Sequence, residues 1–242
     1  MNKAVSAEAD LAASLKAVTF LKPDAGSHVI RLTGRQRELL LQMATHLRLP
    51  PRTIIYREDS PAEWVFIIGE GAVKSYRHLR SGKRVVSAFL FSRDLFGLAE
   101  QGRYVNTAQA ITRVLIYRLP LHDLTVLLKI DGELQFKFLA KITHELREAQ
   151  HRAVLINRRD AAGRLAMFLI GMLEHLDDAA ARLGCVPLPM TRSDIAGFLG
   201  LSLESVSRAA TELERRELVS FETAHMARIL DEAGLMKLSS AA

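Results

Sequence analysis

The spacing of apolar residues changes several times along the chain. Residues 34–47 place Leu39, Leu40, Met43 and Leu47 on one side of a helix, so this segment is predicted to be helical. Short β-branched and aromatic runs then follow at 52–58, 63–78, 83–91 and 106–120, separated by turn residues. Many short strands joined by regular turns predict a small β-roll or sandwich.

After Asp131 a single helical stripe replaces the strands. Apolar residues recur every three or four positions, charged residues flank them, and neither proline nor glycine interrupts the run, which predicts a helix of roughly 35 Å. A long stripe of this kind indicates a seam with a second copy of the chain, and the alternative is a helix packed on its own domain. The predicted seam consists of Leu134, Phe138, Ile142, Leu146, Ala149, Ala153 and Ile156.

Residues 191–214, TRSDIAGFLGLSLESVSRAATELE, have the pattern of a helix-turn-helix. Ala196 is small enough for a close helix crossing, and Gly200 tolerates a positive φ in the turn. The predicted shared core is Ile195, Leu199, Leu201, Val206 and Ala209. The alternative, two amphipathic core helices joined by a glycine turn, does not require Glu and Arg together at an exposed helix tip.

The start of the second helix carries the candidate chemistry for reading DNA. Ser202 can cap this helix, whose N-terminal end enters the major groove in such motifs. Arg208 can bond guanine O6 and N7, and Glu204 can accept from cytosine N4. Two strand candidates, 218–222 and 227–231, predict a wing beside it. The predicted DNA-contacting residues are Thr191, Arg192, Ser202, Leu203, Glu204, Ser205, Ser207 and Arg208.

Composition narrows the class of protein. The 242 residues are 49% hydrophobic, enough for two modest domains, and no run of about 18 uncharged apolar residues is present. The N-terminus is a poor signal peptide, so a cytoplasmic protein is expected. The net charge of +6 fits a polyanionic partner. A single cysteine, Cys185, rules out an intrachain disulfide and an all-cysteine metal site.

The order of roll, long helix, charged break at 157–160, helix-turn-helix and wing resembles the superfamily of the cyclic-AMP receptor protein and the fumarate–nitrate reduction regulator. The resemblance covers nearly everything after about residue 35 and is sharpest over RRDAAGRLAMFLIGMLEHL and MTRSDIAGFLGLSLESVSRAATELERRELVSF. LESVSR resembles the E-x-x-S-R signature of the fumarate–nitrate and FixK-like branch, which implies DNA contact by Glu204, Ser207 and Arg208.

The resemblance implies an α+β protein with three parts. An N-terminal β-roll, a jelly roll like that of cyclic-nucleotide-binding domains, occupies residues 1–131 together with an N-terminal extension. A dimerisation helix spans 132–157, and a C-terminal winged helix-turn-helix DNA-binding domain spans 158–242, with its motif at 192–211. The break at 157–160 is expected to act as a hinge.

Two departures from the family pattern bear on effectors. Cyclic-nucleotide-binding members hold the phosphate with an Arg-Ser pair, whereas the aligned residues here are Asn106 and Thr107, and Arg103 is out of register. A buried phosphate would therefore lack its compensating cation. Oxygen-sensing members carry an N-terminal cysteine cluster, which a chain without cysteine before Cys185 cannot form. FixK-type regulators lack both devices, so no cofactor is expected, and the small-molecule effector is left open.

The resemblance implies a homodimeric bacterial transcription regulator, an activator that binds a palindrome with TTGA and TCAA ends and contacts RNA polymerase. The half-sites would lie about 34 Å apart on double-stranded DNA. The alternative is a cyclic-nucleotide-binding regulatory or interaction module without a DNA role. No nucleophile motif or HExxH sequence supports an enzyme, and nothing indicates a membrane partner.

Two further groups of residues have competing interpretations. Cys185 is predicted to lie in a loop, where Arg182 can lower its pKa and make it an oxidation-sensitive switch; the alternative is a packing cysteine. His144, Glu148 and His151 have the spacing to share a helix face. We expect them to flank the dimer seam rather than bind a metal, and a haem is left open.

Overall fold

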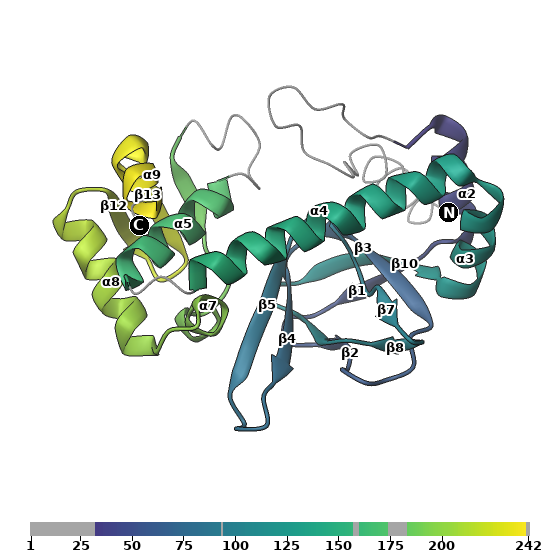
Figure 1. The fold of residues 1–242 in the computed structure, drawn as a ribbon, viewed down its shortest axis with the longest axis horizontal. Helices are drawn as coiled ribbons and strands as arrows, with labels where there is room; N and C mark the ends of the chain where they lie inside the picture. Colours follow the sequence, from purple (N-terminus) through teal and green to yellow (C-terminus); the bar gives the residue numbers. More distant parts are fainter. Residues whose placement is uncertain (1–31, 93, 157–159, 174–182, 241–242) are drawn as a thin grey trace. The chain divides into compact units, whose positions relative to one another are not determined.

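The computed structural model describes residues 32–92, 94–156, 160–173 and 183–240 (Figure 1). The chain divides into two compact units. The first comprises residues 1–77 and 88–149, and the second comprises residues 78–87 and 150–242. None of the described helices is long and apolar enough to cross a membrane.

Two four-stranded sheets make up the roll among the described residues. The first has the order β1 (Thr45–Leu49), β10 (Val114–Pro120), β3 (Trp64–Glu70) and β6 (Leu95–Phe96). The second has the order β2 (Ile54–Tyr56), β9 (Thr107–Ala110), β4 (Val73–His78) and β5 (Arg84–Leu90). A small hairpin, β7 (Ala99–Glu100) with β8 (Arg103–Tyr104), lies in the chain between β6 and β9.

Strands β3 and β10 are apolar on both faces because both faces are covered. Phe66 and Ile116 belong to a cluster that includes residues of the second sheet, such as Tyr56 and Ala108. Ile67 and Tyr117, each the next residue along its strand, belong to a second cluster formed with helices. Since successive strand residues point to opposite faces, burial on both faces produces a continuous apolar run. The strands predicted at 52–58, 63–78, 83–91 and 106–120 are confirmed.

The first helix is shorter than its apolar pattern predicts. Helix α2 (Gly34–Met43) begins with a capping box between Thr33 and Gln36, whose side chains bond each other's backbone N–H. It ends at Met43, and Leu47 lies instead in β1, opposite Ile116 of β10. The prediction of a helix through residue 47 is therefore wrong, because pairing along β10 outweighs local periodicity.

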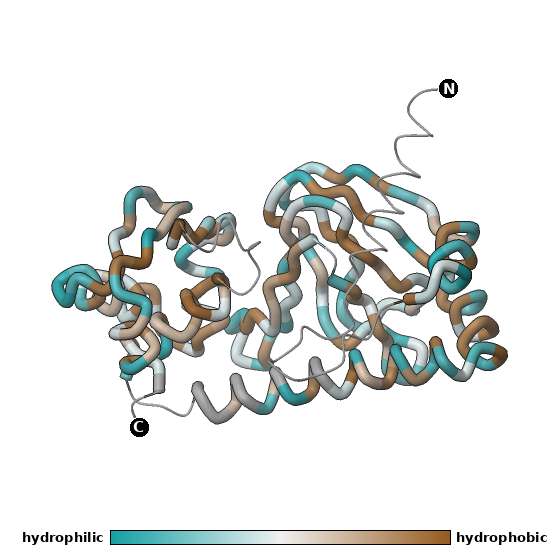
Figure 2. The backbone as a smooth tube through the Cα atoms, turned by 90° about the horizontal axis from the view of Figure 1, so that it is seen from above, coloured by the Kyte–Doolittle hydropathy of each residue, from teal (hydrophilic) through white to brown (hydrophobic). Residues whose placement is uncertain are grey.

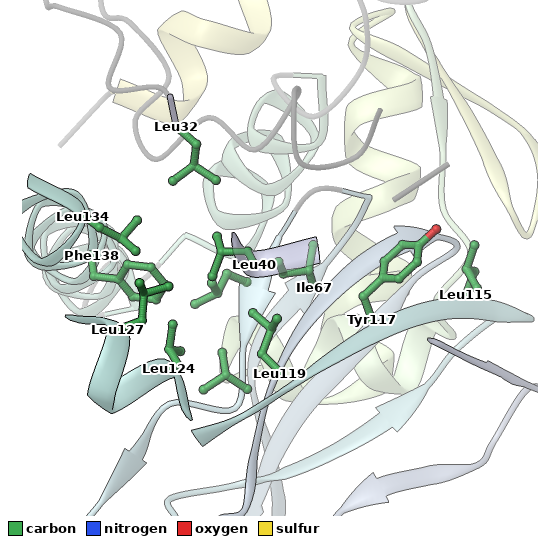
Figure 3. Close-up of a cluster of buried hydrophobic side chains, with 12 residues drawn as sticks. Leu32, Leu40, Ile67, Leu115, Tyr117, Leu119, Leu124, Leu127, Leu134 and Phe138 are labelled. Carbon is green, nitrogen blue, oxygen red and sulfur yellow. The ribbon is translucent and has the colours of Figure 1, made fainter. Parts of the chain in front are cut away.

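Helix α4 (Gly132–Ile156) presents different surfaces along its length. Hydrophobic and hydrophilic residues alternate along its coloured part in Figure 2. Leu134 is 0% exposed and Phe138 5% exposed, and both pack in the cluster of Leu40 from α2 and Leu124 from α3 (Leu121–Ile130) (Figure 3). The prediction that Leu134 and Phe138 face a second copy is wrong, since their side chains are already buried in their own roll.

The second unit contains a three-stranded antiparallel sheet, ordered β11 (Cys185–Pro187), β13 (Met226–Ile229) and β12 (Val219–Thr223). Helix α5 (Ala161–Leu173) packs against α8 (Leu203–Arg215) and α9 (Glu232–Ser240). Asp160 caps α5, accepting from the N–H groups of Ala162 and Gly163 at 3.1 and 2.9 Å, while the rest of the predicted hinge lies outside the described residues. Between β11 and α8 the chain forms helix α7 (Arg192–Leu199).

Candidate nucleic-acid interface

Helix α7 starts with a reciprocal cap. The Thr191 hydroxyl oxygen accepts from the Asp194 N–H at 3.1 Å, and Asp194 Oδ2 accepts from the Thr191 N–H at 3.3 Å and from its hydroxyl at 2.8 Å. Thr191 was expected to contact DNA, but its hydroxyl hydrogen is directed at Asp194. Arg192, the next residue, is exposed at the same end of the helix.

The turn between α7 and α8 has the predicted construction. Gly200 adopts φ 67° and ψ 26°, a left-handed conformation in which a Cβ is unfavourable. The Leu201 N–H then bonds the Ala196 carbonyl at 3.0 Å. Ser202 caps α8 by accepting from the Ser205 N–H at 3.1 Å, and the two hydroxyls lie 3.0 Å apart. The predicted left-handed conformation of Gly200 and the predicted helix cap at Ser202 are confirmed.

The inner faces of α7 and α8 are buried as the motif requires. Arg164 of α5 donates to the Leu199 carbonyl at 3.0 Å, satisfying one of the carbonyls left unpaired at the end of α7. The rings of Phe168 and Phe198 lie 5.7 Å apart. These contacts fix the motif on α5. Buried residues of the shared core are Ile195, Ala196, Leu199, Val206 and Ala209, while Leu201 is half-buried.

The N-terminal end of α8 directs two opposite charges outward. Glu204 and Arg208 are both exposed and stand four residues apart, with the acid nearer the N-terminus, the favourable order for such a pair. The pKa of Glu204 is lowered, first by a hydrogen bond with Ser202 and also by the charge of Arg208, so this carboxylate stays ionised. Leu203 beside it is 49% exposed, whereas Ser205 and Ser207 are half-buried.

The other end of α8 holds a second charged group. Arg215 makes two hydrogen bonds of 2.9 Å with Glu212, and Arg216 donates to the same carboxylate at 2.6 Å. These bonds lower the pKa of Glu212 to about 2. Both guanidinium groups are therefore bonded to Glu212 at the end of α8, whereas Glu204 and Arg208 at its start are exposed.

The wing contains a strand that the sequence did not predict. Cys185 lies in β11 opposite Arg228 of β13, so its prediction as a loop residue is wrong. Arg228 donates to Glu222 at 2.6 Å, and this bond raises the pKa of Arg228. Cys185 is half-buried, and Arg182 lies outside the described residues.

In the roll, the residues aligned with the phosphate-binding pair are engaged internally. Asn106 Oδ1 accepts from the Tyr56 hydroxyl at 3.2 Å, and the Thr107 hydroxyl accepts from the Glu58 N–H at 3.0 Å. The Glu58 carboxylate is in turn paired with Arg77 at 2.6 Å. Arg103, the nearby cation in the sequence, donates to the Asp59 carbonyl.

Aromatic rings fill the space between the two sheets beside this segment. Tyr56 and Tyr104 stack with ring centroids 3.9 Å apart, and Phe66 and Phe96 stack at 5.2 Å. The Tyr104 hydroxyl donates to the Trp64 carbonyl at 2.8 Å and accepts from its N–H at 3.1 Å. Burial raises the pKa of both tyrosines, so these hydroxyls remain neutral donors.

Helix α4 also exposes several apolar side chains along its length. Ile142 and Leu146 from the predicted seam are 46% and 57% exposed, and Ala149 and Ala153 are also exposed. Phe136 at 63% and Leu139 at 58% were missed by the sequence analysis. The side chains of Ile156, His144, Glu148 and His151 lie outside the described residues. Within the described part of the chain, no group of three His, Cys, Asp or Glu could hold a metal ion.

Comparison with known proteins agrees with this arrangement. Residues 46–131 match the cyclic nucleotide-binding domain family, and residues 163–238 match the Crp-like helix-turn-helix domain family. The transcriptional activatory protein AadR of Rhodopseudomonas palustris is 33% identical over 178 residues, covering 74% of each chain. The chain belongs to the CRP/FNR family of transcription regulators.

Other relatives place this CRP/FNR regulator in the FixK-like branch. The nitrogen fixation regulation protein FixK of Azorhizobium caulinodans is 29% identical over 209 residues, covering 86% of this chain and 84% of that protein. The structure of FixK2 from Bradyrhizobium japonicum matches with a TM-score of 0.77 and 35% identity, covering 82% of this chain and 98% of that one. The regulator is thus a DNA-binding transcription factor related to activators, and the family and fold predicted from the sequence are confirmed.

Proposed function

We propose that this regulator recognises DNA bases through the N-terminal end of α8, with Glu204 and Arg208 as the reading residues. The observation that carries the proposal is their shared exposure one helical turn apart, with Glu204 kept ionised. Arg208 would bond the guanine of a TTGA half-site, and Glu204 would accept from the N4 group of its paired cytosine. One G·C pair would then be read on both strands.

The neighbouring residues divide between base contact, phosphate contact and support. Leu203, exposed and apolar, suits contact with a thymine methyl group. Exposed Arg192 suits a backbone phosphate, and the half-buried Ser207 remains a candidate contact. Thr191 supports the start of α7 through its bonds with Asp194, and Ser202 and Ser205 support the start of α8 by bonding each other. We therefore assign these three residues to positioning the motif.

The test of base reading is Arg208→Ala, measured by titration of a TTGA-N-TCAA duplex and of random duplex. We expect specific binding to weaken by about 1–3 kcal/mol and the preference for guanine to relax. Arg215→Ala is the matched control, since it removes the same charge from the far end of the helix. Equal losses on both duplexes would make Arg208 a phosphate contact and overturn its reading role.

We propose that the regulator is a homodimer joined through α4. Leu139, Ile142, Leu146, Ala149 and Ala153 recur at alternating spacings of three and four, the heptad spacing of a two-helix seam. Their exposure in the single chain is what supports the proposal. A symmetric dimer would set two α8 helices into half-sites about 34 Å apart.

The dimer is tested with Ile142→Glu. A carboxylate without a partner in an apolar seam is costly to bury, so the variant should be monomeric by light scattering and lose tight DNA binding. The control is Arg147→Glu, whose exposed position lies about 140° away around the helix. A dimer that survives Ile142→Glu at full DNA affinity would exclude this face as the seam.

We further propose that the DNA-bound dimer acts in the cytoplasm by contacting RNA polymerase, as suits a relative of named activators, and that it has no enzymatic activity of its own. A cyclic-nucleotide response is the second candidate function, favoured by the match of residues 46–131 to the cyclic nucleotide-binding domain family. Two observations disfavour a cyclic-nucleotide response. Asn106 and Thr107 are already bonded within the roll, and neither residue supplies a cation for a phosphate.

A further inference from the structure

The turn between β4 and β5 belongs to the second unit, together with the DNA-reading motif. The turn is closed by bonds from the Leu79 N–H to the Lys83 carbonyl at 2.9 Å and from the Gly82 N–H to the Leu79 carbonyl at 2.8 Å. From the strand that follows this turn, Arg84 reaches the first helix of the motif. Its Nη2 lies 2.9 Å from Asp194 Oδ1.

The Asp194 carboxylate is only 2% exposed, so its charge must be compensated by neighbouring groups. Its Oδ2 is occupied by the N–H and hydroxyl of Thr191, which are neutral donors. Arg84 brings a full positive charge to Oδ1, and its own side chain is 35% exposed. Removing one partner of a buried pair leaves an uncompensated charge, which is far more costly than losing a surface ion pair.

A second contact shows that α7 and this strand are fitted to each other. Gly197 follows Asp194 by three residues and therefore lies on the same face of the helix. A Cβ at Gly197 would lie 3.3 Å from the Arg84 carbonyl oxygen, which is tighter than ordinary contact, and 3.4 Å from Val86 Cγ2. The absence of a side chain thus allows the backbone of α7 to approach the strand beside the Arg84–Asp194 pair.

We propose that Arg84 is a positioning residue for DNA recognition. By neutralising Asp194 it holds the cap at the start of α7, and α7 in turn sets the orientation of α8 through the turn at Gly200. Arg84 acts through Asp194 and does not itself contact DNA. The proposal extends the base-reading role proposed for α8 but concerns a residue outside the helix-turn-helix.

The experiment compares Arg84→Ala, Arg84→Lys and the control Lys83→Ala, which removes an exposed cation from the same turn. Affinity for specific and random duplexes is measured over a series of salt concentrations, alongside the melting temperature. We expect Arg84→Ala to weaken specific binding about tenfold and random binding much less, with Arg84→Lys recovering part of the loss. Lys83→Ala should leave the specific-to-random ratio unchanged.

The salt series separates positioning from direct phosphate contact. Loss of a phosphate contact lowers the slope of log K against log salt by about 0.9, whereas a positioning residue leaves the slope unchanged. Asp194→Asn removes the charge that Arg84 compensates, so Arg84→Ala should cost less than about twofold in that background. If Asp194→Asn does not fold, the salt slope of Arg84→Ala and the comparison with Lys83→Ala still test whether Arg84 is a positioning residue.

Three outcomes would overturn the proposal. The first is a reduced salt slope in Arg84→Ala, which would make Arg84 a phosphate contact. The second is a loss of specific affinity on Arg84→Ala that is as large in the Asp194→Asn background as in the parent protein, which would show that Arg84 does not act through Asp194. The third is a fall in the specific-to-random affinity ratio on Lys83→Ala equal to that on Arg84→Ala. If Arg208→Ala loses its guanine preference while Arg84→Ala binds like the parent protein, base reading by α8 stands and the Arg84 proposal fails. The two proposals are therefore distinguishable.

Discussion

Residues 104–107 of the roll and residues 203–208 of α8 are two places where a CRP/FNR regulator can recognise a ligand, and they differ in how far their polar groups are covered by their own unit. In the roll, Tyr104, Asn106 and Thr107 bond other groups of the same roll. In α8, Glu204 and Arg208 extend from the surface, and capping is left to Ser202. The difference teaches that polar side chains are covered by their own unit in the first segment and are exposed to solvent in the second.

The same contrast occurs within a single helix. Phe138 of α4 is 5% exposed in the core of the roll, and Ile142, one turn later, is 46% exposed. Both are large apolar residues of one sequence stripe, yet only the second is available to a partner. Available surface, rather than residue type, therefore decides which positions can take part in recognition.

The largest effect expected from the comparison is on the stability of the roll. Tyr104→Ala removes a ring that is 3% exposed and stacked on Tyr56, so a cavity should cost about 3–5 kcal/mol in the free energy of unfolding. Denaturant unfolding followed by circular dichroism measures this loss. Arg208→Ala, at an exposed site, should change the same quantity by less than about 0.5 kcal/mol.

Tyr104→Phe sharpens this prediction because it keeps the ring and removes only the hydroxyl. The Trp64 carbonyl and N–H then lose their partner, at a cost of about 1–3 kcal/mol, less than the loss from alanine. If Tyr104→Ala were as stable as the parent protein, the aromatic stack would not be a structural core, and the contrast with α8 would fail.

A smaller effect is expected from oxidation of Cys185. Peroxide converts a thiol to sulfenic and then sulfinic acid, and the added negative charge would stand opposite Arg228 in the wing. Charge added near the DNA backbone opposes binding, and we expect a loss of about threefold, within the range of screened surface interactions.

Cys185→Ala is the control for this oxidation, since it should bind DNA normally and remain insensitive to peroxide. Mass spectrometry of the treated protein, paired with a gel shift, reports modification and affinity together. A folded protein whose Cys185 stays unmodified under peroxide would identify it as a packing residue and exclude the switch.

The reading motif was largely predictable from the sequence because its determinants are local. Gly200 in the turn and Ser202 at the cap act on neighbouring residues, so their spacing alone predicts their roles. The exposed apolar face of α4 was predicted less well, because periodicity does not show which residues of a helix are covered by other elements. Leu134 is buried by α2 and α3, whereas Phe136 is exposed, and only the packing of the roll separates them.

Long-range pairings were not predictable for the same physical reason. Cys185 reads as a loop residue between prolines and glycine, and its strand character depends on Arg228, a residue far along the chain. Leu47 continues a helical pattern, yet pairing with Ile116 places it in a strand. Likewise, no local pattern connects Arg84 with Asp194 across 110 residues of sequence.

The smallest expected effect is that of cyclic AMP, for which the comparison predicts none. The segment aligned with the phosphate-binding pair offers Asn106 and Thr107, both already bonded within the roll, and Tyr104 stacks beside them in the core. A phosphate buried there would lack a bidentate cation, and its desolvation would go uncompensated. A ligand that does bind the folded state raises its stability by about 2.7 kcal/mol at a hundredfold excess over Kd. We therefore expect millimolar cyclic AMP to change neither the melting temperature nor the affinity for the TTGA-N-TCAA duplex. A clear thermal shift would show that the roll can open its aromatic core to a nucleotide, and the contrast between an internally satisfied roll and an outward-reading α8 would no longer hold.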